Sequence, residues 1–97
     1  MNKEVKIAVY GFNSDKEFIA KIQRYCYNRH NKYVGEYHFK AKCYIVTTDD
    51  VIYKYYYIPK YEIIPGRMYD KVLVVDDGLF NLQMRVSSIK DFEFIHL

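Results

Sequence analysis

The chain has 97 residues, of which 51% are hydrophobic and 28% charged, which excludes an intrinsically disordered polypeptide and predicts one domain, residues 1–97, around a single core. No run of about 18 apolar residues occurs and no apolar segment typical of a signal peptide follows Met1, so we expect a cytoplasmic protein without a membrane span. The net charge of +3 is uneven, because residues 1–46 carry nine lysines and arginines against four acids, whereas residues 47–97 carry six against eight.

A strand followed by a helix is predicted at the start of the chain. The segment Lys6–Tyr10 is rich in small and branched apolar residues and ends at Gly11, which is typical of a strand. Ser14 and Glu17 have the spacing of a capping box, which predicts a helix over about residues 14–28. Its apolar stripe recurs at helical spacing and consists of Phe18, Ile19, Ile22, Tyr25 and Cys26.

The middle of the chain predicts two strands. Apolar and polar residues alternate from Tyr33 to Thr47, which predicts one long strand with an exposed face. The segment Val51–Ile58 is rich in tyrosine and β-branched residues and predicts a second strand, although a short helix capped by a threonine fits the same spacing. Cys26 and Cys43 are predicted to be buried, reduced thiols.

The C-terminal part predicts further strands and completes the expected fold class. Lys71–Asp76 is the most apolar of them, Asp77-Gly78 is predicted to form a hairpin turn into a returning strand over Phe80–Val86, and a short strand is predicted over Phe92–His96. We therefore expect an α+β fold, with one helix packed on a mostly antiparallel sheet of four to six strands. The alternative is a small α/β fold in which Val72–Val75 is a central strand.

One segment carries a resemblance to a known family. In Gly66–Asp77 a glycine and an arginine precede Asp-Lys-Val, and an apolar strand then ends in two acids. The segment resembles the Walker B strand of phage-type P-loop ATPase-like proteins, and Tyr44–Thr48 is similar to the strand and turn before it, so the resemblance spans about residues 44–78. It implies that Asp76 coordinates magnesium and that Asp77 is the neighbouring acid.

The rest of the ATPase machinery is missing from the sequence. No G-x-x-x-x-G-K-[ST] motif is present to cradle phosphates, so ATP hydrolysis is not expected and the family resemblance leaves a degenerate nucleotide-binding domain as its functional alternative. In the other interpretation Asp76 and Asp77 are turn residues of the hairpin. The three histidines are scattered, and no catalytic residue, cofactor or metal ligand is predicted.

These observations predict a small, non-enzymatic binding protein. The abundance of tyrosine, lysine, isoleucine and asparagine suggests an AT-rich genome, and small compact chains without catalytic motifs are common in phages and mobile elements. We therefore expect a phage-encoded inhibitor of a host enzyme or defence complex, present in the host cytoplasm and acting by occupying a protein surface. Single-stranded nucleic acid is the alternative partner, because His38, Lys40, Lys42 and Tyr44 are predicted on one strand face. A homodimer is a further alternative.

The candidate partner contacts are the cations of the basic N-terminal half and the tyrosines of the middle strands. Exposed cations suit an acidic partner, and tyrosine is enriched where proteins meet. The residues are Lys21, Arg24, Arg29, Lys32, Lys40, Lys42, Tyr44, Tyr53, Tyr55, Tyr56 and Tyr57.

Overall fold

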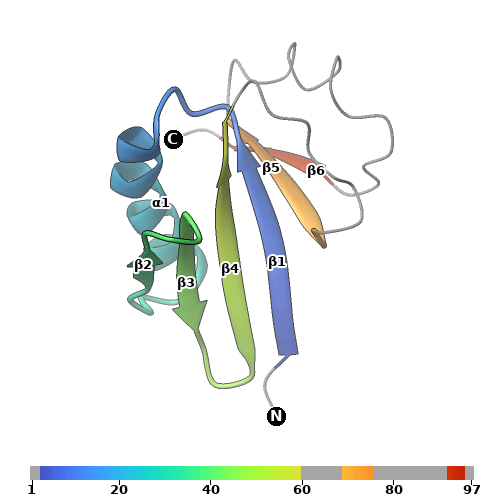
Figure 1. Ribbon diagram of the computed structural model, residues 1–97. Helices are drawn as coiled ribbons and strands as arrows, with labels where there is room; N and C mark the ends of the chain where they lie inside the picture. Colours follow the sequence, from blue (N-terminus) through green and yellow to red (C-terminus); the bar gives the residue numbers. More distant parts are fainter. Residues whose placement is uncertain (1–2, 60–68, 76–91, 96–97) are drawn as a thin grey trace.

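The computed structural model describes residues 3–59, 69–75 and 92–95 of the chain. These residues form one helix and six strands in a single sheet of order β2-β3-β4-β1-β5-β6 (Figure 1). In chain order the elements are β1 (Lys3–Tyr10), α1 (Asp15–Arg29), β2 (Glu36–His38), β3 (Cys43–Thr47), β4 (Val51–Ile58), β5 (Lys71–Val75) and β6 (Phe92–Ile95).

The predicted α+β class, the helix and the number of strands are confirmed, but the sheet is mixed rather than mostly antiparallel. β1 pairs in parallel with both β4 and β5, and β5 pairs in parallel with β6. Only the β2–β3 and β3–β4 pairs are antiparallel. The parallel β1–β4 pair follows from its connection, since α1, β2 and β3 all lie between β1 and β4 in the chain and supply the long crossover that a parallel pair requires. Strand periodicity carries no information on this direction.

The interpretation of β5 as a strand that folds back into a hairpin is wrong. Val72, Leu73 and Val74 pair with β1 on one side and with β6 on the other, so neither edge of this segment is left for a returning strand. β5 is thus an inner strand, as the α/β alternative expected. The predicted strand over Phe80–Val86 and the acids Asp76 and Asp77 lie outside the described residues.

The single long strand predicted from Tyr33 to Thr47 is also wrong. It is divided into β2 and β3 by a turn over residues 39–42, in which Lys42 has a φ of 50°. The alternation of apolar and polar residues continues through the turn, so periodicity did not reveal the break. The predicted strand over Val51–Ile58 is confirmed as β4, and Thr48 closes the β3–β4 turn, with its hydroxyl accepting from the Val51 amide at 3.1 Å.

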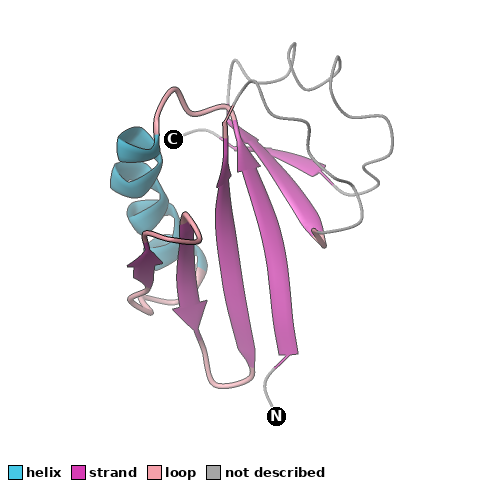
Figure 2. Ribbon diagram, in the orientation of Figure 1, coloured by secondary structure: helices cyan, strands magenta, loops and turns pink. Residues whose placement is uncertain are grey.

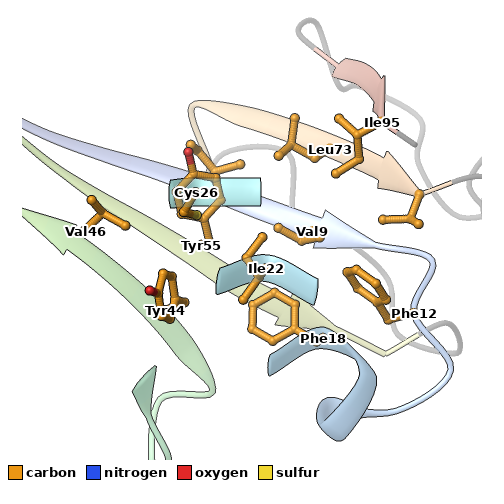
Figure 3. Close-up of a cluster of buried hydrophobic side chains, with 12 residues drawn as sticks. Val9, Phe12, Phe18, Ile22, Cys26, Tyr44, Val46, Tyr55, Leu73 and Ile95 are labelled. Atoms are coloured by element: carbon orange, nitrogen blue, oxygen red, sulfur yellow. The ribbon is translucent and has the colours of Figure 1, made fainter. Parts of the chain in front are cut away.

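The main core lies between α1 and one face of the sheet (Figure 2). α1 begins after Ser14, whose hydroxyl accepts from the Glu17 amide at 3.3 Å as the capping box predicts. Its residues Phe18, Ile22 and Cys26 are completely buried, and Figure 3 shows them among side chains of the sheet, including Val9. Burial of one such large side chain stabilises the fold by roughly 1.5–3 kcal/mol. Cys26 and Cys43 are buried and unpaired, as predicted.

The opposite face of the central strands is buried as well. Ala8 and Tyr10 of β1 and Val72 and Val74 of β5 are each at most 2% exposed and form a second apolar cluster with Ile58. Burial on both faces explains why β1 and β5 contain uninterrupted apolar runs instead of alternating ones.

The turn between β1 and α1 passes very close to the end of β5. Gly11 has a φ of 121°, and a Cβ atom built on it would lie 2.6 Å from the carbonyl oxygen of Val75. At the other end of the β1–β5 pair, the Lys6 amide donates to the Asp70 carboxylate at 2.8 Å and the Asp70 amide donates to the Lys6 carbonyl at 2.7 Å. Contacts at both ends therefore determine the register of this pair.

Replacement of Gly11 by alanine is expected to lower the free energy of unfolding by about 2 kcal/mol or more. Alanine disfavours a positive φ, and its Cβ would push the turn away from β5. Urea denaturation followed by circular dichroism measures the change. Lys16→Ala, at an exposed position of α1, is the control and should stay within about 0.5 kcal/mol of the unsubstituted protein. Equal stability of the Gly11→Ala and Lys16→Ala variants would contradict the role assigned to Gly11.

Candidate functional site

The six predicted contact cations are all exposed, but they come from three separate segments. Three belong to α1, one to the loop after it and two to the β2–β3 turn: Lys21, Arg24, Arg29, Lys32, Lys40 and Lys42. Four ion pairs occur among the described residues, and none of them includes any of these six side chains. Their charges are therefore available to a partner.

The nucleic-acid-binding face predicted for this region does not form. Lys40 and Lys42 lie in the turn, whereas Tyr44 belongs to β3 and is only 3% exposed. The Tyr44 hydroxyl accepts a hydrogen bond from the Gly35 amide at 2.9 Å. Because its ring is packed in the core with α1, Tyr44 cannot stack on a base.

Most tyrosines of β4 lie in the main core or pack against it. Tyr53, Tyr55 and Tyr57 share one face of the sheet and Tyr56 lies on the other, as side chains alternate along a strand. Tyr55 is 2% exposed and offers no surface to a partner. The ring of Tyr57 lies 5.6 Å from that of Phe18 in α1, between centroids. Tyr56 packs on Tyr69 with the same centroid separation, on the opposite face of the sheet.

Sequence reasoning missed the exposed apolar side chains beside α1. Val34 is 80% exposed, Phe39 is 78% exposed and Tyr27 is 43% exposed. Val34 and Phe39 lie before and after β2, which is an edge strand of the described sheet, and Tyr27 lies on α1. Val34 and Phe39 escaped notice because both fell within the single strand predicted from Tyr33 to Thr47, where Phe39 would share the face of apolar Cys43 and Ile45. Exposure of bulky apolar groups is the signal of an interaction site, and it appears only once the fold is known.

A shallow groove joins Tyr27 and Val34, but not Phe39, to one of the predicted cations. Its volume is about 370 Å³, and its lining includes Arg24 and Tyr27 of α1, Val34 and Gly35 of the following loop, and Tyr44 beneath them. Gly35 permits the close approach of this loop to β3, since an added Cβ would lie 2.5 Å from the nearest atom of the Tyr44 ring. We use the name α1–β2 surface for Arg24, Tyr27, Val34, Phe39, Lys40 and Lys42.

Aromatic contacts hold β2 and the β2–β3 turn against α1. Phe39 meets Tyr37 edge-on with ring centroids 4.9 Å apart, and Tyr37 lies 6.2 Å from Phe18. The Tyr57 amide of β4 donates to the carbonyl of Lys42 at 2.9 Å. The backbone of the turn is thus anchored to the sheet while its cationic side chains point into solvent.

A polar cluster lies under the C-terminal end of α1, on the other flank of the helix. His30, the C-cap residue, shares a hydrogen bond of 2.5 Å between its Nε2 and the hydroxyl of Tyr55, and its ring stacks on Tyr53. Burial lowers the pKa of His30, and nearby Arg29 lowers it further. Burial also raises the pKa of Tyr55 and raises the pKa of Cys26 to about 12. The thiol and the phenol are therefore protonated near neutrality, and neither provides an anionic nucleophile.

The start of α1 does not favour a phosphate group. The helix N-terminus attracts anions in general, but Asp15 and Glu17 occupy its first turn and repel a further negative charge. Asp76 and Asp77, the acids implied by the Walker B resemblance, lie outside the described residues, and their assignment stays a prediction.

The free energy of unfolding is expected to fall between pH 7.5 and pH 5.5 because of His30. The pKa of His30 is lowered in the folded chain, so the unfolded chain binds the proton more readily. The contribution of neutral His30 to the free energy of unfolding is therefore complete above the unfolded pKa of about 6.5 and is lost as the pH falls below it. Urea denaturation at pH 7.5, 6.5 and 5.5 measures the loss, and His30→Gln should reduce it.

The control is Lys16→Ala, at an exposed position of α1, which leaves the polar cluster intact. This variant should keep the full dependence on pH. A dependence that survives His30→Gln unchanged would show that burial of this imidazole is not its source.

Metal ligands and membrane spans are not found in the described part of the chain. Within residues 3–59, 69–75 and 92–95, no three His, Cys, Asp or Glu side chains lie close enough together to hold a metal ion. The helix described there is too short and too polar to cross a membrane. No protein-family model, no curated protein and no solved structure matches this chain.

Proposed function

We propose that the chain is a non-enzymatic binding protein that recognises an acidic protein through the α1–β2 surface. The observation that carries this proposal is the exposure of Val34 and Phe39 beside cations that have no ion-pair partner among the described residues. An apolar centre within a charged rim is the usual anatomy of a protein interface. Burial of these apolar groups would supply affinity, and the cations would steer an acidic partner.

The rigidity of the surface supports the same proposal. Phe39 is held by Tyr37, and the groove between α1 and the loop rests on the buried ring of Tyr44. The backbone of the turn and the floor of the groove are therefore held in place before a partner binds, which reduces the entropic cost of association. Occupation of a partner's surface requires no catalytic group. Inhibition of a host enzyme or defence complex by a phage-encoded protein is the mode of action that we propose for such a surface.

Reversal of the turn cations is expected to weaken capture of the partner. The tagged protein is used to capture an acidic host protein from a lysate, and the dissociation constant of the purified pair is then measured for each variant. Lys40→Glu and Lys42→Glu should each slow association, and the double variant should lose roughly tenfold or more in affinity because both charges would then repel the partner. Phe39→Ala should lower affinity by a similar factor without charge change, through loss of a buried aromatic anchor.

The matched control for charge is Lys3→Glu, at the exposed start of β1 on the far side of β3 and β4 from the turn. It should bind as the unsubstituted protein does. A partner whose affinity is equal for Lys3→Glu and for the Lys40→Glu, Lys42→Glu double variant would overturn the proposed surface. A gel-shift titration with single-stranded DNA and RNA at two salt concentrations tests the rival partner, and salt-sensitive binding there would favour nucleic acid over protein.

A further inference from the structure

A second concave site lies on the opposite flank of α1 from the α1–β2 surface. It is a pocket of about 280 Å³ between the C-terminal end of the helix and the N-terminal halves of β1, β4 and β5. Aliphatic side chains from β1 and β5 close its floor. None of the residues that line the shallow groove between α1 and the loop before β2 lines this pocket. Its aromatic and charged lining consists of Tyr25, Arg29, His30, Tyr53, Tyr55 and Lys71.

The aromatic walls of the pocket are held in fixed positions. The ring centroids of His30 and Tyr53 are 4.1 Å apart with planes inclined by 31°, and Tyr25 meets Tyr55 edge-on at 6.2 Å. The hydrogen bond between His30 and Tyr55 ties the end of the helix to β4. A flat ligand can therefore gain aromatic contact without the cost of ordering these side chains.

Among the residues that the structure describes, the charged groups at the pocket leave one positive charge in excess. Nζ of Lys71 lies 2.7 Å from the carboxylate of Glu93, so this pair is neutral as a unit. Arg29 belongs to none of the ion pairs among the described residues. A single negative charge on a ligand would thus be balanced by Arg29. A doubly charged group such as a phosphate would leave an excess negative charge beside Glu93 and the negative end of α1.

We propose that this pocket binds a small aromatic monocarboxylate, with its ring against Tyr25 and Tyr53 and its carboxylate at the guanidinium of Arg29. The planar fork of arginine matches the two oxygens of a carboxylate. The volume is slightly below that of sites for drug-sized ligands, which favours a compound with a single ring. This site is independent of the protein partner proposed for the α1–β2 surface.

A nuclear magnetic resonance titration with benzoate tests the site. The isotope-labelled chain is titrated with benzoate up to 10 mM, and the amide signals of Arg29, His30 and Tyr53 should shift together and reach saturation. Benzamide, which has nearly the same shape without the charge, should bind roughly tenfold more weakly, and cyclohexanecarboxylate, which lacks the aromatic ring, should also be weaker.

Two variants locate the charge and the ring contact. Arg29→Gln should lower the affinity for benzoate roughly tenfold, whereas Arg24→Gln, the same change on the other flank of the helix, should leave it unchanged. Tyr53→Leu should abolish the preference for benzoate over cyclohexanecarboxylate. The proposal is overturned if benzoate gives no saturable shifts, if benzamide binds equally well, or if Arg29→Gln and Arg24→Gln have the same effect.

Discussion

The close approach of the β1–α1 turn to the end of β5 is the contact on which the arrangement of the molecule depends. β1 lies between β4 and β5, and its C-terminal half is paired on both sides. The chain must leave this position and reverse onto one face of the sheet, and it does so at Gly11, where even a methyl group would overlap the Val75 carbonyl. A larger residue would separate β1 from β5 at the end where Phe12 is buried in the core.

The sequence predicted the strands and the helix better than it predicted their connections. Uninterrupted apolar runs in β1 and β5 indicate strands that are covered on both faces, and the capping box at Ser14 indicates where α1 begins. Neither pattern contains the direction of pairing, because the same residues fit a parallel or an antiparallel neighbour. The hairpin after β5 was expected from neighbouring residues alone. It is excluded by pairing with segments that are distant in sequence, because β1 and β6 occupy both edges of β5.

The exposure of the candidate contact residues was predicted in part, for a physical reason that differs between cations and tyrosines. A lysine or arginine is almost always exposed, so the six cations could be assigned to the surface from residue type alone. A tyrosine has a ring that can be buried and a hydroxyl that can find a partner inside, so its location depends on what covers it. Tyr44 and Tyr55 are buried because the Gly35 amide and His30 satisfy their hydroxyls. Those partners are nine and 25 residues away in sequence, beyond the reach of any local pattern.

The period of a single helix separates the two concave sites. Gln23 and Tyr27 are one turn apart on the flank of α1 that faces the loop before β2, and Tyr25 and Arg29 are one turn apart on the flank that faces β1 and β5. Ile22 and Cys26 lie between these flanks and are buried against the sheet. Because both flanks belong to one helix that is fixed by this core, each site has an ordered wall at no separate cost in conformational entropy. The stability of the α1 core is therefore the common requirement for binding at either site.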